Sequence, residues 1–145
     1  MADRAISTEG IATMDLVSIR IITDDLERLV GFYERVTGIA ATRLNSVFAE
    51  LPTASSTLAI GHTSTTRLFG DDSARPAENR SVIVEFKVVD VDTEYERLLP
   101  IVDEWVQQPT TMPWGNRSIL FRDPDGNLVN VFTPVTADAV GRQSR

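Results

Sequence analysis

Residues 114–132 read WGNRSILFRDPDGNLVNVF, and no other stretch of the chain says as much about its fold. Residues 118–122 are rich in apolar side chains and favour a strand, and residues 128–132 favour a second strand. The Asp-Pro-Asp-Gly-Asn segment between them is dense in turn-forming residues. Pro124 presets φ for an early turn position, and Gly126 adopts a left-handed conformation at little cost. The stretch therefore predicts a β-hairpin.

Length and composition limit the possible classes of protein. The chain has 145 residues and 42% hydrophobic residues, which favours one compact domain. We find no apolar run of the roughly 20 residues that a membrane span requires, and no export signal, so we expect a cytoplasmic protein. Cysteine is absent, which excludes disulfides and thiolate chemistry. A net charge of -7 argues against nucleic-acid binding and would suit a cationic small molecule.

The first half of the chain predicts one helix and four strands. Residues 17–22 alternate in polarity as a half-buried strand does. Asp24 and Glu27 have the spacing of a capping box, apolar residues follow at helical spacing, and Gly38 is expected to end that helix. Shorter extended segments are expected near residues 40–44, 47–51 and 57–62.

The same order of elements returns after a polar segment at residues 63–80. Residues 82–88 alternate as a strand, and Asp90 or Asp92 can cap a second helix that Pro100 should end. A short strand is expected at residues 105–106, before the hairpin.

A constant shift of 65 positions superimposes the two halves. It aligns same-class residues at seven positions of the strand–helix unit, which indicates an internal duplication. Two unrelated amphipathic units would also look alike, but the hairpin favours duplication. The aligned pairs are Val17 with Val82, Ile19 with Val84, Ile21 with Phe86, Asp25 with Asp90, Val30 with Tyr95, Tyr33 with Leu98, and Val36 with Ile101.

From Asp15 to Pro134 the chain resembles the vicinal oxygen chelate superfamily, which includes glyoxalase I, bleomycin-resistance proteins and extradiol dioxygenases. The resemblance is carried by Asp25-Leu26-Glu27, Phe32-Tyr33 and Gly38 in the first helix, and by the hairpin. It implies an α+β fold in which tandem βαβββ modules form a cupped mixed sheet. The expected divisions are a flexible arm at 1–14, one domain at 15–134 with modules 15–62 and 81–134 joined by linker 63–80, and a flexible tail at 135–145.

The resemblance also implies where a metal site would lie. Enzymes of the family hold a divalent ion with His or Gln on the first strand of each module and with Glu, Gln or His on the last. Those positions fall on Ser18 and Ile83, and on Ile60 and Asn130. Alkyl groups cannot bind a metal, and a hydroxyl and an amide are poor ligands for a transition metal. We therefore expect neither a metal nor another cofactor, and we assign no catalytic residue.

Two other side chains could form an unorthodox site. Glu85 and His62 lie within two residues of the expected ligand positions, but Arg20 and Lys87 lie equally close and would oppose a cation. His62 is the single histidine of the chain and could equally be a half-exposed surface residue. Asp123 and Asp125, in contrast, are expected to form the hairpin turn rather than to act as acid or base.

The predicted ligand-binding residues are those that alternation places on the face of each sheet opposite the helix-packing residues. Arg20, Glu85 and Lys87 could orient a ligand, or form an internal ion-pair cluster, and Glu50 could join them. Trp114 and Phe132 are candidate apolar walls, with core packing as the alternative. The full set is Ser18, Arg20, Ile60, His62, Ile83, Glu85, Lys87, Trp114, Asn130 and Phe132.

The sequence thus favours a metal-free, drug-sequestering type of protein that binds a small organic ligand in a cup and forms a homodimer. The main alternative is a glyoxalase-like lyase or an extradiol dioxygenase with divergent metal ligands. A metal-independent enzyme using Glu85 or His62 as a base, and an accessory protein without a ligand, also remain open.

Overall fold

The structure is a computed structural model that describes residues 13–144, so predictions for residues 1–12 of the expected arm lie outside the described residues. The first module forms one four-stranded sheet in the order β1-β4-β3-β2, in which β1 and β4 are parallel. One helix crosses from β1 to β2. The elements are β1 (Ser18–Thr23), α1 (Leu26–Thr37), β2 (Thr42–Asn45), β3 (Phe48–Pro52) and β4 (Thr57–His62).

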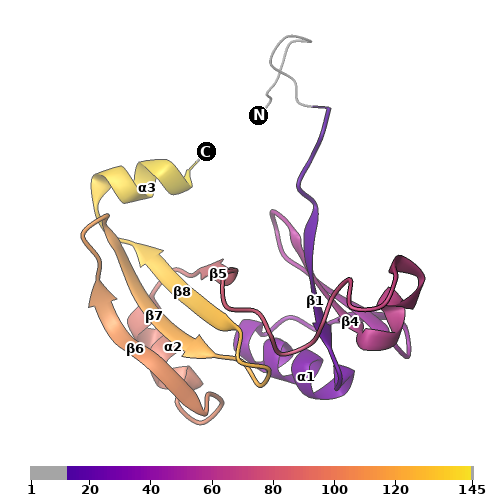
Figure 1. Ribbon diagram of the computed structural model, residues 1–145. Helices are drawn as coiled ribbons and strands as arrows, with labels where there is room; N and C mark the ends of the chain where they lie inside the picture. The colour runs from indigo at the N-terminus through magenta and orange to yellow at the C-terminus, as the bar shows by residue number, and fades with distance from the viewer. Residues whose placement is uncertain (1–12, 145) are drawn as a thin grey trace.

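The second module repeats this topology, with a sheet in the order β5-β8-β7-β6 and a parallel β5–β8 pair. The predicted tandem βαβββ arrangement is confirmed (Figure 1). Its elements are β5 (Ile83–Lys87), α2 (Val91–Leu98), β6 (Glu104–Thr111), β7 (Asn116–Arg122) and β8 (Leu128–Pro134).

The starts of the two helices preserve the duplication in detail. Asp25 caps α1 by accepting a hydrogen bond from Arg28 N, and Asp90, 65 positions later, caps α2. The expectation that Asp24 caps the first helix is wrong, because its carboxylate instead accepts a 2.6 Å hydrogen bond from the Thr63 hydroxyl. Gly38 ends α1 with φ 72°, as predicted.

Helix α1 joins the two modules into one core. In Figure 1 it lies at the base of the molecule, between the two sheets. Its Phe32 ring contacts Phe121 of β7 at 6.1 Å between centroids, and Tyr33 contacts Phe86 of β5 at 6.3 Å. The faces of the two sheets that α1 and α2 cover therefore share one hydrophobic interior. The opposite faces of the two sheets are called the open faces.

The hairpin turn is fastened to α1 by buried polar contacts. Asp123 is 4% exposed, and it accepts hydrogen bonds from the backbone of Asp125 and Asn127 and from the Tyr33 hydroxyl at 2.7 Å. Burial, followed by the nearby Asp123 carboxylate, raises the pKa of Tyr33 well above its usual value. Arg28 of α1 also forms an ion pair with Asp125 at 2.8 Å. The turn is thus a structural junction between the modules.

Two segments expected to be irregular form helices. The linker begins with a 3-10 helix, η1 (Thr63–Phe69), and the tail contains α3 (Ala137–Gln143), which packs on β8. Gly115 makes this packing possible, since a Cβ there would collide with the Thr136 hydroxyl and its φ of 96° disfavours other residues. Among the described residues, no helix is long and apolar enough to cross a membrane.

Candidate ligand-binding site

Register decides which side chains of the first sheet face away from α1. Arg20 pairs with Ala59, while Ile60 pairs with Ile21 and with Ala49. Paired residues point to the same side of a sheet. Ile60 is 1% exposed and belongs to the core, so the structure differs from the expectation that it lines a cup. Arg20 and Glu85 are equivalent in the two modules, and they pair with Ala59 and Asn130, respectively. Ala59 is therefore the counterpart of Asn130.

The second sheet brings five of the predicted residues onto one face. Glu85 pairs with Asn130, and Lys87 pairs with Phe132, all on the same side of the sheet as Ile83. The amide of Asn130 donates a 2.9 Å hydrogen bond to Glu85 Oε2. The side-chain Oδ1 of Asn130 is buried and has no hydrogen-bond partner among the described residues. Phe132 is buried, and the carbonyl of Gln143 in α3 accepts a hydrogen bond from Lys87.

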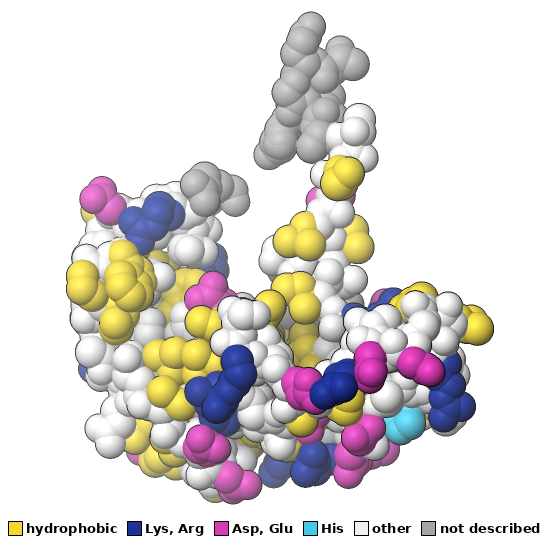
Figure 2. All heavy atoms as spheres, viewed as in Figure 1, with side chains coloured by type: hydrophobic (Ala, Val, Ile, Leu, Met, Phe, Trp, Pro, Cys, Tyr) yellow, Lys and Arg dark blue, Asp and Glu magenta, His cyan; other side chains and the backbone are white. Residues whose placement is uncertain are grey.

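A cavity of about 580 Å³ lies where β1, β5 and the end of α1 meet. Its walls include Ile19 of β1, Leu58 of β4, and Ile83 and Phe86 of β5. Figure 2 shows hydrophobic side chains along both sides of the hollow between the upright strand and the opposite lobe. The apolar walls suit the body of an organic molecule.

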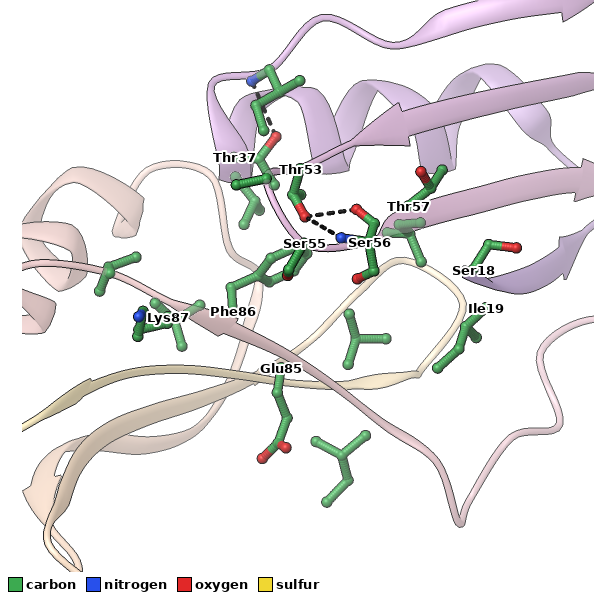
Figure 3. Close-up of a pocket in the computed structure, with 18 of the residues that line it drawn as sticks. Ser18, Ile19, Thr37, Thr53, Ser55, Ser56, Thr57, Glu85, Phe86 and Lys87 are labelled. Carbon is green, nitrogen blue, oxygen red and sulfur yellow. Dashed lines mark hydrogen bonds between the residues drawn. The ribbon is translucent and has the colours of Figure 1, made fainter. Parts of the chain in front are cut away.

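Polar groups surround the apolar walls of the cavity. Figure 3 shows Thr53, Ser55 and Ser56 from the β3–β4 loop on one side and Glu85 and Lys87 of β5 on the other. The hydroxyl-rich loop 53–56 was not singled out from the sequence, where it reads as an ordinary connection. Residues from segments this far apart can be identified as neighbours only once the modules are packed together.

Four predicted residues line the cavity, namely Ser18, Ile83, Glu85 and Lys87. His62 does not, because its Nδ1 accepts a hydrogen bond from Ser64 N and thereby caps η1. Trp114 is 57% exposed near α3, where its carbonyl accepts a hydrogen bond from Arg142. The other four predicted residues outside the cavity lining are Arg20, Ile60, Asn130 and Phe132.

Arg20 lies outside the cavity lining, and its side chain runs toward Gly61 of β4. Its guanidinium lies over the Phe48 ring at 5.2 Å from the centroid and over the Phe69 ring at 5.9 Å. Ser18, two residues earlier on the same face of β1, lines the cavity. The sequence indicated Arg20 as a cup residue, but it gave no signal that Phe69 of the linker would reach it.

The side chains on the open faces do not fit a divalent metal. Within residues 13–144, no group of three or more His, Asp or Glu side chains could hold an ion. Ser18, Ile83 and Asn130 offer no charged ligand, and the fourth position is filled by Ala59 according to the register. Glu85 remains, but Lys87 lies on the same face and would oppose a cation.

The comparisons with known proteins agree with this architecture. The family model of the Glyoxalase/Bleomycin resistance protein/Dioxygenase superfamily matches residues 15–131. The chain therefore belongs to this superfamily. A comparison with curated proteins found no match.

Solved structures of other proteins share the fold. A glyoxalase/bleomycin resistance protein/dioxygenase from Nocardioides has a TM-score of 0.72 at 25% identity, covering 90% of this chain and 90% of its own. A family enzyme from Burkholderia phytofirmans PsJN has a TM-score of 0.72 at 18% identity, covering 84% of this chain and all of its own. A protein of unknown function from Agrobacterium tumefaciens reaches 0.73 at 25% identity, covering 85% and 96%.

Proposed function

We propose that the protein binds a small organic molecule between β1 and β5 without a metal ion, and that it sequesters the ligand rather than transforming it. The cavity of about 580 Å³ carries this proposal, since ligand sites in proteins measure roughly 300–1,000 Å³ and combine apolar walls with a few polar groups. The lack of a fitting set of metal ligands among residues 13–144 favours binding over the metal-dependent lyase and dioxygenase reactions.

A thermal-shift screen with a cavity-filling variant tests this function. The probes are aromatic carboxylates, catechols, cationic antibiotics, glutathione adducts and divalent metals. Ser55→Phe places a large side chain in the exposed loop at the cavity, and Ser73→Phe makes the same change in the linker, away from it. We expect an organic probe to stabilise the wild type and Ser73→Phe by about 2.7 kcal/mol at one hundred times its Kd, and Ser55→Phe by much less.

Two outcomes contradict the proposal. The first is stabilisation by metals alone, with activity that a chelator removes, which would support the divergent lyase or dioxygenase. The second is an organic probe that binds Ser55→Phe as tightly as the wild type, which would place the ligand outside this cavity.

We further propose that the protein acts as a homodimer in which a second copy completes the walls of the site. Strands β1 and β5 are the edge strands of their sheets, and each leaves one row of backbone groups unpaired among the described residues. Val17 and Ile19, and Val82 and Ile83, are exposed at these edges. Because the two modules share one topology, β1 of one copy is suited to pair with β5 of another, with twofold symmetry.

The dimer is tested by light scattering after size-exclusion chromatography. Val17→Lys and Val82→Lys add charge at the two edges and are expected to shift the protein toward monomer at equal concentration. Val89→Lys is the matched control, because Val89 is 95% exposed and lies in the connection between β5 and α2. A wild type that is monomeric at every concentration, or edge variants that behave like the control, would contradict the dimer.

A further inference from the structure

A second, smaller cavity of about 220 Å³ lies where the linker enters β5, beside the β7–β8 turn. Two arginines line it, namely Arg80 at the end of the linker and Arg122 at the end of β7. Cavities that hold organic ligands measure roughly 300–1,000 Å³. The smaller cavity is therefore better suited to a small ion or to one polar group of a larger molecule.

Strand register places the Arg122 side chain on the open face of the second sheet, at this cavity. Arg122 pairs with Leu128 of β8, and Leu128 pairs with Ile83 of β5, so the three side chains form one row on the same face. All three residues line the cavity. Nη1 of Arg122 donates a 3.1 Å hydrogen bond to the carbonyl of Gly126, which holds the guanidinium beside the turn. Other N–H groups of the same guanidinium are left to bind a ligand.

The segment that carries Arg80 is fixed to the turn by one side chain. Asn79 Nδ2 donates hydrogen bonds to the carbonyl of Val82 at 2.7 Å and to Asn127 Oδ1 at 3.1 Å. Asn79 Oδ1 accepts hydrogen bonds from the backbone N–H groups of Ser81 and Val82. The backbone on both sides of Arg80 is therefore ordered before any ligand arrives, which lowers the entropy cost of binding.

The two arginines carry positive charge that no described carboxylate balances at close range. Five other arginines form ion pairs within residues 13–144, but neither Arg80 nor Arg122 does so. The nearby carboxylates of Asp123 and Asp125 are bonded to side chains of α1. Two guanidinium groups at one small cavity repel each other, and a bound anion would offset this repulsion.

We propose that Arg80 and Arg122 form a binding site for a phosphate dianion, either as the free ion or as the phosphate group of a small organic molecule. The site goes beyond the proposed ligand binding and does not depend on it, although Ile83 lines both cavities. The oxygens of a phosphate can accept hydrogen bonds from both guanidinium groups at once, and the fork of an arginine matches two of them. The net charge of -7 disfavours a long polyanion such as a nucleic acid.

One acidic neighbour limits the affinity of this site. Glu104 of β6 pairs with Arg122, so its side chain lies on the same face one strand away. The two side chains form no ion pair, but the Glu104 carboxylate would weaken the attraction for an anion. Removing its charge with Glu104→Gln is therefore expected to strengthen phosphate binding.

Calorimetric titration of the full chain with inorganic phosphate, at pH 8 and constant ionic strength, tests the site. Phosphate is then a dianion, since its second pKa lies near about 6. We expect Arg80→Gln and Arg122→Gln each to weaken phosphate binding about tenfold, and the double variant to abolish it. Arg35→Gln is the matched control, because it removes an exposed charge from α1 and Arg35 lines neither cavity.

The outcomes decide both the site and the source of the phosphate. Phenyl phosphate that binds more tightly than inorganic phosphate supports a phosphorylated organic ligand, and equal or weaker binding supports the free ion. Phosphate that binds no more tightly than chloride overturns the site, and so does equal binding by Arg80→Gln and Arg35→Gln. Because Arg80 is exposed, its variant keeps the test decisive if Arg122→Gln disturbs the turn. Ser55→Phe should bind phosphate as the wild type does, so the two cavities are tested separately.

Discussion

The two modules share a topology but differ on their open faces. In module one, Arg20 stacks on aromatic rings beside the buried Ala59, and no described residue accepts a hydrogen bond from its guanidinium. In module two, Glu85 is hydrogen-bonded to Asn130, and Lys87 reaches α3. The duplicated features are those that form the backbone and the core, such as the Asp25 and Asp90 caps. The open faces carry no such constraint, and their side chains differ between the two modules.

The largest effect is expected at the junction that joins the modules. Asp123→Ala would leave the Tyr33 hydroxyl and two backbone N–H groups without their acceptor in a buried setting. We expect the free energy of unfolding to fall by about 3 kcal/mol, as when one partner of a buried charged network is removed. Urea unfolding measures this loss. Asp71→Ala, in the exposed linker, is the control, and an equal effect of both changes would contradict a junction at Asp123.

The same junction predicts a loss of stability at alkaline pH. Because burial and Asp123 raise the pKa of Tyr33 in the folded protein, the unfolded chain releases the tyrosine proton first, near its usual pKa of about 10. The unfolded state then binds fewer protons, so the free energy of unfolding falls as pH rises above about 10, by up to about 1.4 kcal/mol per pH unit.

Unfolding measured between pH 8 and 11 tests this dependence. Tyr33→Phe should remove this part of the slope, while Tyr95→Phe should retain it. A slope that persists unchanged in Tyr33→Phe would show that other groups cause the alkaline loss.

A smaller effect compares the two helix caps. Asp25→Ala and Asp90→Ala should each reduce the free energy of unfolding by about 1 kcal/mol, since each removes an acceptor for helix N–H groups. Asp24→Ala removes only the contact with Thr63 and should cost less than Asp25→Ala. Thermal unfolding of the three variants measures the order. If Asp24→Ala lowers the free energy of unfolding more than Asp25→Ala does, the capping role assigned to Asp25 is wrong.

The sequence predicted the fold well because local signals agreed with one another. The hairpin turn, Gly38 and the 65-residue repeat all depend on short-range chemistry that the structure retains. The site was harder to predict. Ile60 was placed on the wrong face because strand register depends on partners far away in the chain, and a shift of one residue reverses the face. Phe69 lies near Arg20 only because residues 63–69 form η1, and the composition of residues 63–80 does not predict a helix there.

The central claim is that the cavity between the modules binds an organic ligand without a metal. Equilibrium dialysis of the full chain against Zn²⁺, Ni²⁺, Mn²⁺ and Fe²⁺, followed by elemental analysis, tests it most directly. The account predicts that the protein retains no stoichiometric metal, in the presence or absence of benzoate. Tight binding of one ion per chain, lost in Glu85→Gln but kept in the control Glu96→Gln, would contradict it.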